Sequence, residues 1–204
     1  MGDTRDVFNE PEQRVLLRTA DVYQTEAADQ GTEGYSDTLL AVVANFKNSG
    51  KPEGMNAQSM VGKSKRGEVA CRLFAVVNPE TQVIEKAGFK TRGCLAMTAC
   101  ASVVCSMMEG CTLTHALKIT REDVRAAVDG VPAGKANTLY FATEAVHALV
   151  CDYLVRQGAT LADLDEVAPC DPYSVECIMC EHCSLRDIRT DMLVDAIEVE
   201  EATQ

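Results

Sequence analysis

Alternating hydrophobic and polar positions between residues 68 and 92 predict two neighbouring strands. Every second residue from Val69 to Val77 is apolar, so these side chains share one face of an extended chain. Residues 78–81 (N-P-E-T) have the composition of a tight turn. Residues 82–92 are then expected to return as the second strand, with Gly88 as a candidate β-bulge. The pattern predicts an antiparallel hairpin.

Apolar residues at helical spacing predict helices before and after this hairpin. Ser36 can cap a helix that carries Leu39 and Val43, and Cys94 opens a helix that runs to Glu109 before a glycine. Further helices are expected over residues 113–119, 121–130 and 139–157, and from residue 161 to the proline at 169. A small antiparallel β-sheet followed by several helices predicts an α+β fold, with the helices packed on the sheet.

Composition along the chain divides it into three segments. Residues 1–34 form a polar, acidic N-terminal extension, and residues 35–155 carry the periodic patterns of a folded domain. Residues 156–204 form a cysteine-rich segment that ends in an acidic tail from residue 187, which we expect to be solvated.

The charge balance excludes several classes of partner. Nineteen basic and 31 acidic residues give a net charge of −12, which disfavours binding to nucleic acid or to a membrane surface. Aromatic residues make up 5% and tryptophan is absent, which disfavours a base-stacking platform. No secretory signal or membrane-length apolar run is present, so we expect a cytoplasmic protein. In that compartment the ten cysteines are mostly reduced and available for metal or thiol chemistry.

Cys94 is the most distinctive single cysteine. It follows Gly93 where the predicted strand gives way to a helix, and the amide groups and dipole of a helix N-terminus favour a thiolate. The alternative is a buried, inert thiol, and the local sequence supports both interpretations about equally. Four other cysteines lie in apolar parts of predicted strands and helices and are expected to fill the core: Cys71, Cys100, Cys105 and Cys151.

A second group of cysteines lies near the C-terminus. Cys170, Cys177, Cys180 and Cys183 form a C-x6-C-x2-C-x2-C pattern, with His182 beside the last. A C-x2-C pair brings two sulfurs to one metal ion with little strain, and four cysteines complete a tetrahedral site or hold an iron–sulfur cluster. The spacing predicts a metal site and leaves zinc and an iron–sulfur cluster open.

Several short motifs support a family resemblance. They are Met60-Val61-Gly62, Gly67-Glu68 and the stretch A-G-F-K-T-R-G-C at residues 87–94. On these motifs, the chain from Tyr35 to about Tyr153 resembles the IscU/NifU family of iron–sulfur cluster assembly scaffolds. The resemblance implies an α+β domain, an iron–sulfur cluster as cargo, and a cysteine desulfurase and apoprotein acceptors as partners.

The ligand pattern departs from that family. Scaffolds of this type use three cysteines and an aspartate, and the resemblance places these at Arg66, Glu68, Cys94 and Thr138. Two thiolates are therefore missing, although a cluster needs four ligands. The resemblance implies Cys94 as the sulfur acceptor. Together with the C-terminal pattern, the expected metal ligands are Cys94, Glu68, Cys170, Cys177, Cys180 and Cys183.

These observations leave two arrangements and three functions open. The C-terminal cysteines could fold back to complete the Cys94 site, or they could bind a metal of their own while the domain docks partners. The favoured function is a divergent scaffold or carrier that passes a cluster to apoproteins. The alternatives are a zinc-bound sulfur acceptor that stimulates a cysteine desulfurase, and a degenerate scaffold that serves as a docking module. No hydrolase, kinase or dehydrogenase motif is present, so we do not expect an enzyme.

Overall fold

The computed structural model describes residues 32–170 and 182–202, and the residues from Tyr35 onward form one compact unit. Most of the predicted N-terminal extension, and the predicted ligands Cys177 and Cys180, lie outside the described residues. The elements in chain order are α2 (Asp37–Ala44), β1 (Ala57–Lys63), β2 (Val69–Val77), β3 (Ile84–Thr91), α3 (Leu95–Met108), α4 (Leu113–Ala116), α5 (Arg121–Ala127), the 3-10 turn η1 (Ala133–Lys135), α6 (Asn137–Arg156), α7 (Leu161–Val167) and α9 (Ser184–Ala202).

The three strands form one antiparallel sheet in the order β1-β2-β3. The register places Cys71 of β2 between Val61 of β1 and Thr91 of β3. The predicted hairpin of β2 and β3 is confirmed, whereas β1 was not predicted. Its sequence, A-Q-S-M-V-G-K, has too few apolar residues to announce a strand.

Gly88 pairs regularly with Phe74, so the predicted bulge at this glycine is wrong. The register shift lies instead between Val76 and Val77. A Cβ atom at Gly88 would overlap the carbonyl oxygen of Gly50 and lie 2.9 Å from the Cδ atom of Pro52. Glycine is therefore required because the preceding loop passes directly over β3.

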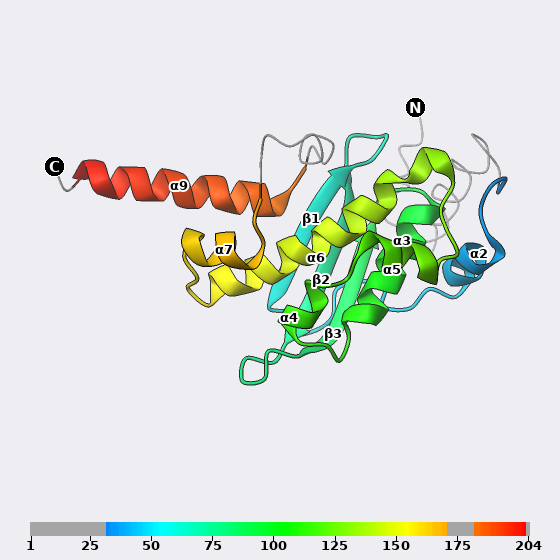
Figure 1. Cartoon of the computed structure of the whole chain (residues 1–204), viewed down its shortest axis with the longest axis horizontal. Helices are drawn as coiled ribbons and strands as arrows, with labels where there is room; N and C mark the ends of the chain where they lie inside the picture. The colour runs from blue at the N-terminus through cyan, green and yellow to red at the C-terminus, as the bar shows by residue number, and fades with distance from the viewer. Residues whose placement is uncertain (1–31, 171–181, 203–204) are drawn as a thin grey trace, which may run out of the picture. The chain divides into compact units, whose positions relative to one another are not determined.

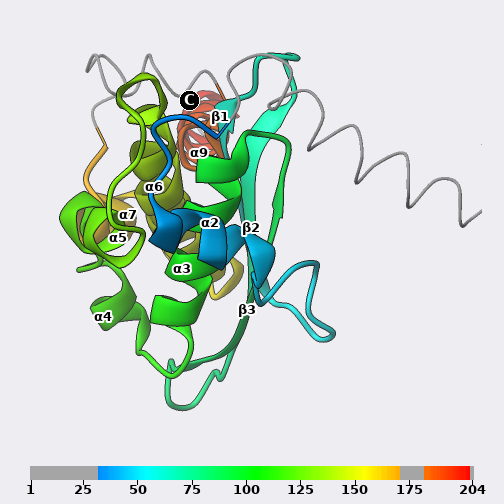
Figure 2. The ribbon, with the colours of Figure 1, turned by 90° about the vertical axis from the view of Figure 1, so that its right-hand side faces the viewer.

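Helices α3 and α6 lie side by side on one face of the sheet (Figures 1 and 2). Helix α6 packs along β1 and β2, α3 packs along β3, and α2 covers α3. The core between these layers is rich in small and aliphatic side chains, among them Ala99, Val104, Ala145 and Leu149. The predicted α+β class, with helices packed on a small antiparallel sheet, is confirmed.

The predicted helix caps are also confirmed. The Ser36 hydroxyl accepts a hydrogen bond from the Leu39 amide at 3.1 Å, and Thr120 and Thr160 form complete capping boxes with the aspartates three residues later. Helices α4 and α5 are shorter than predicted. Tight i to i+3 bonds follow their last turns, such as that from the Ile119 amide to the Ala116 carbonyl at 3.1 Å.

Short segments cover both edges of the sheet. Ser49 forms a parallel bridge to Phe89 of β3, and Cys183 forms an antiparallel bridge to Val61 of β1. Helix α9 continues from Cys183 and packs against α6, β1 and α7. The expectation of a solvated acidic tail is wrong for the first half of this helix, where Arg189 is buried. The helix meets a surface that apolar residues of α6 and β1 create, which tail composition alone does not reveal.

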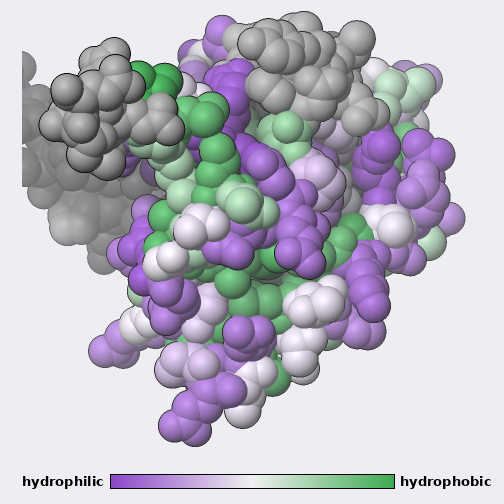
Figure 3. Space-filling view, turned by 60° about the vertical axis from the view of Figure 1, so that its left-hand side comes forward, coloured by the Kyte–Doolittle hydropathy of each residue, from purple (hydrophilic) through white to green (hydrophobic). Residues whose placement is uncertain are grey.

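The second half of α9 is exposed. It carries three large apolar side chains at the surface, Leu193, Val194 and Ile197. On the face drawn in Figure 3, hydrophobic residues lie exposed between hydrophilic ones. Within the part of the chain that the structure describes, no helix combines the length and the apolar character needed to cross a membrane.

Candidate functional site

Cys94 caps the N-terminus of α3. Its backbone is extended, and its carbonyl accepts the first helical bond from the Thr98 amide at 3.1 Å. The side chain is 8% exposed, which places the thiol just below the surface at the positive end of a 14-residue helix. A Cβ atom on Gly93 would lie 2.9 Å from the Cβ atom of Met97, so glycine permits the close turn into the helix.

Glu68 reaches the same end of the sheet from the turn between β1 and β2. Its carboxylate lies 3.9 Å from the Nε atom of Arg92, two residues before Cys94. The Arg92 amide also donates to the Ala70 carbonyl at 3.1 Å, which fixes the chain leading to Cys94 beside the start of β2. Both side chains of the pair are about half exposed, so the ion pair adds little stability and leaves the carboxylate accessible. Glu68 and Cys94 therefore come from neighbouring chain segments at one end of the domain.

Thr138 occupies the position that the family resemblance assigns to a third cysteine. It lies in the first turn of α6, is 3% exposed and donates to the Lys135 carbonyl at 2.7 Å. Its hydroxyl oxygen is 3.7 Å from the Sγ atom of Cys100. Burial raises the pKa of Cys100 to about 12, and the neighbouring Cys94 thiol raises it further. The thiol nearest to position 138 is consequently protonated at neutral pH.

The other core cysteines behave in the same way. Burial is the main cause that raises the pKa of Cys71 and of Cys105, and neighbouring thiols add to it in both cases. Both residues have no exposed surface, as predicted for core cysteines. They pack the interior and offer no thiolate to a metal.

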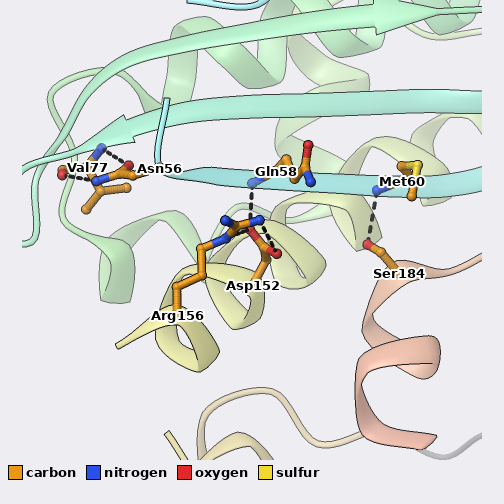
Figure 4. A network of polar contacts seen from close by, with 7 residues as sticks. All are labelled: Asn56, Gln58, Met60, Val77, Asp152, Arg156 and Ser184. Carbon is orange, nitrogen blue, oxygen red and sulfur yellow. Dashed lines mark hydrogen bonds and ion pairs between the residues drawn. The ribbon is translucent and has the colours of Figure 1, made fainter. Parts of the chain in front are cut away.

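The C-terminal segment is anchored along the outer edge of β1 (Figure 4). The Gly62 amide donates to the His182 carbonyl at 2.8 Å, and the Met60 amide donates to the Ser184 hydroxyl at 3.0 Å. Asp152 of α6 accepts from the amide of Gln58 at 2.8 Å. Three alternate amides of the edge strand therefore have partners from the C-terminal part of the chain, and Cys183 is held in the middle of this contact.

His182 places the segment beside the turn that carries Glu68. Its Nε2 atom lies 3.4 Å from the carbonyl oxygen of Gly67. The turn between β1 and β2 thus contacts the C-terminal segment through an imidazole, and the neighbouring Cys183 side chain is buried at 7% exposure.

Cys151 joins the two described cysteines of the C-terminal segment. Burial raises the pKa of Cys151 to about 11; the Arg189 guanidinium lowers it, and the nearby Cys170 and Cys183 thiols raise it. Thirteen residues of helix separate Cys151 from Thr138, a distance of about 20 Å along α6 at 1.5 Å per residue. The structure therefore brings Cys170 and Cys183 together with Cys151, whereas Cys94 neighbours Cys100.

No three His, Cys, Asp or Glu side chains form a metal-binding group within residues 32–170 and 182–202. Cys177 and Cys180, which complete the predicted C-terminal ligand set, lie outside these ranges. The ligand set stays a prediction.

Three polar residues of these sites were not singled out from the sequence: Arg92, Asp152 and Arg189. The i, i+4 spacing of Asp152 and Arg156 on α6 is a recognisable ion-pair signal, and the two side chains do pair at 2.8 Å. The spacing cannot reveal that the same carboxylate also accepts from β1. Nothing local distinguishes Arg189 from an ordinary surface arginine.

Comparison with known proteins gives matches to one family over the domain that carries Glu68 and Cys94. A family model described as the NifU-like N-terminal domain matches residues 34–160. The chain is similar to the iron–sulfur cluster assembly scaffold protein IscU of Aquifex aeolicus (strain VF5), at 33% identity over 125 residues, covering 61% of this chain and 78% of that protein.

A second relative is the nitrogen fixation protein NifU of Azotobacter chroococcum mcd 1. It is 36% identical over 119 residues, which cover 58% of this chain and 38% of that protein. A solved structure of a nitrogen-fixing NifU-like protein (N-terminal) from Brucella abortus aligns with 68% of this chain and 98% of that chain, at 14% identity and a TM-score of 0.48. The family match ends at residue 160, before the cysteines of the C-terminal segment.

Proposed function

The chain belongs to the family of NifU-like N-terminal domains, and on this premise we propose that it is a scaffold or carrier for iron–sulfur clusters. It binds iron and sulfide, or a preformed cluster, and passes this cargo to apoproteins without turning over a small substrate. The observation that carries the proposal is the similarity to an iron–sulfur cluster assembly scaffold across the segment that holds Glu68 and Cys94. Their position at one end of the sheet, near the surface, supports it.

Cys94 is the proposed sulfur acceptor. A cysteine desulfurase carries a persulfide, and the Cys94 thiolate attacks its terminal sulfur. A sulfur–sulfur bond forms on Cys94 while the bond in the donor breaks, and the donor cysteine leaves as a thiolate, so that no external oxidant or reductant is needed. The N-terminus of α3 favours the attacking thiolate through its free amide groups and its dipole.

Glu68 is the proposed carboxylate ligand for iron beside Cys94. The pair supplies two of the four ligands that a cluster requires. Arg66, at the expected position of another ligand, brings a positive charge that favours an anionic sulfur species over a bare cation. This site is therefore suited to receiving sulfur and to brief contact with a cluster, and less suited to holding one permanently.

The C-terminal cysteines are proposed to hold a centre of their own. Cys170, Cys177, Cys180 and Cys183 would supply four thiolates to an iron–sulfur cluster or, alternatively, to zinc. The position of Cys170 and Cys183 beside Cys151 favours a separate centre over completion of the Cys94 site. The protein would then combine a sulfur-accepting domain with an adjoining thiolate centre.

The deciding measurement is the amount of iron, zinc and acid-labile sulfide per chain after anaerobic purification of the full chain. Iron with an equal amount of sulfide supports the scaffold or carrier. Zinc without sulfide favours a zinc-bound sulfur acceptor that stimulates a desulfurase. The absence of metal under reducing conditions favours a docking module and contradicts the proposal.

The role of Cys94 has a matched control on the same helix. We expect Cys94→Ala to lose sulfur transfer at this site when the protein is incubated with a cysteine desulfurase and cysteine, because the attacking thiolate is gone. Cys105→Ala removes a buried thiol of α3 whose pKa is raised by burial, and it should accept sulfur as the wild type does. Peptide mass spectrometry locates the added sulfur. A wild-type protein that carries sulfur at other cysteines and none at Cys94 would refute this role.

A further inference from the structure

One side chain, Arg189, holds both ends of the segment that contains the remaining C-terminal cysteines. Its Nη2 atom donates to the carbonyls of Leu164 at 2.9 Å and Ala168 at 2.7 Å, at the end of α7 and two residues before Cys170. Its Nη1 atom pairs with the Asp165 carboxylate. Arg189 itself lies on α9, six residues after Cys183. The guanidinium therefore sets the positions from which Cys170 and Cys183 extend.

The same guanidinium carries an unused donor. Arg189 is 9% exposed, and its Nε atom has no hydrogen-bond partner among the residues that the structure describes. A buried N–H group without an acceptor is costly, and a buried cation needs a neighbouring negative charge. Its positive charge acts on the Cys151 thiol, which also neighbours Cys170 and Cys183. A thiolate in this cluster would supply both the missing acceptor and the negative charge.

The start of α9 adds a second positive feature at Cys183. The Asp187 amide donates to the Cys183 carbonyl at 3.1 Å, so Cys183 occupies the cap position of this 19-residue helix. The helix dipole favours negative charge there. The bridge to Val61 and the bonds from β1 to the residues on either side of Cys183 hold it in place before any ligand arrives. The site is thus built to stabilise a thiolate.

From these contacts we propose that Arg189 is the positioning residue of the C-terminal thiolate centre. Its Nε group donates to a metal-bound thiolate of Cys170 or Cys183 and offsets part of the negative charge that thiolate ligands bring to a metal. Cys151 forms the inner wall of the centre. The inference rests on the proposed C-terminal metal centre and names a residue outside its ligand set. Groups that donate to ligating atoms orient them and tune the metal.

The test uses the full chain loaded with Zn²⁺ or Co²⁺ and three variants. Arg189→Gln removes the charge and the Nε donor, and we expect Zn²⁺ affinity to fall about 10- to 100-fold. Arg189→Lys keeps the charge without the Nε group, so we expect a smaller loss. Both should shift the thiolate-to-cobalt charge-transfer band, because a hydrogen bond to sulfur is lost. Asp165→Asn breaks the ion pair and leaves Nε in place, so its affinity and band should match the wild type.

Each outcome separates this inference from the proposed centre. Metal that the wild type retains after Cys170→Ser and Cys183→Ser are combined would refute the C-terminal centre, and the inference with it. Metal that depends on those cysteines, with an unchanged band and affinity in both Arg189 variants, would refute only the role of Arg189. Equal losses in Arg189→Gln and Asp165→Asn would reduce Arg189 to a structural clamp. Circular dichroism melting curves identify any variant that fails to fold.

Discussion

At the scale of single residues, the surroundings of a side chain decide what its chemistry can do. Cys94 and Cys100 lie six residues apart, yet Cys94 caps a helix near the surface whereas Cys100 has no exposed area. Burial raises the pKa of Cys100 to about 12, so it stays a thiol. The cysteine count alone would treat the two as equal ligands, and only their positions separate an acceptor from a core residue.

Gly88 provides a test at this scale. We expect Gly88→Ala to lower the free energy of unfolding by about 1–3 kcal/mol, because the new methyl group overlaps the backbone of the loop at Gly50. Gly134 is the matched control, since a Cβ atom there meets nothing within 4 Å, and Gly134→Ala should change the value by less than about 0.5 kcal/mol. Urea unfolding followed by circular dichroism measures both. Equal midpoints for the two variants would contradict the crowding at Gly88.

At the scale of elements, the capping boxes link local sequence to acid stability. Asp123 and Asp163 each accept hydrogen bonds from the hydroxyl and amide of the cap threonine, and these bonds lower the pKa of both carboxyls. A carboxyl with a lower pKa in the folded state stabilises the fold above its unfolded pKa. That contribution is lost as the pH falls through the folded value.

We therefore expect replacement of both aspartates by asparagine to weaken the dependence of stability on acid. Asp123→Asn combined with Asp163→Asn should melt at a lower temperature than the wild type at pH 7, and the gap should close as the pH drops below about 4. Thermal melts from pH 7 to acid follow the change. Asp195→Asn, at an exposed position of α9, is the control and should preserve the wild-type profile. A gap that stays constant with pH would contradict the assignment.

At the scale of the whole molecule, the C-terminal segment replaces a fourth strand. The amides of Met60 and Gly62 donate to Ser184 and His182, and α9 continues onto α6. An edge strand without such partners presents unpaired backbone groups and invites pairing with another chain. The segment that carries the proposed metal centre is thus also part of the protection of the sheet.

This arrangement predicts the result of two truncations. A chain that ends at Ala168 loses the partners of Met60 and Gly62, so we expect it to associate as its concentration rises, while the full chain under the same conditions does so less. A chain that ends at Met192 loses only the exposed half of α9 and should behave as the full chain does. Light scattering after size exclusion, with a reductant present, measures both. Identical masses for all three chains at every concentration would contradict a protective role.

The strand that the sequence did not reveal shows why prediction stopped where it did. Gln58 and Ser59 are polar, yet the Gln58 amide donates to Asp152 and the Ser59 hydroxyl donates to the Ala145 carbonyl at 2.7 Å. Both partners lie on α6, far along the chain. Polar residues that are buried through distant partners erase the alternating pattern on which strand prediction depends.

Local interactions were legible from the sequence by itself. The caps at Ser36, Thr120 and Thr160, the hairpin of β2 and β3, and the place of Cys94 at the start of α3 all depend on residues within a few positions of one another. The family resemblance rests on the same contiguous text. Only the tertiary structure decided which cysteines meet, how Arg189 joins α7 to α9, and what covers β1, because these contacts join residues that are distant in sequence and carry no local signal.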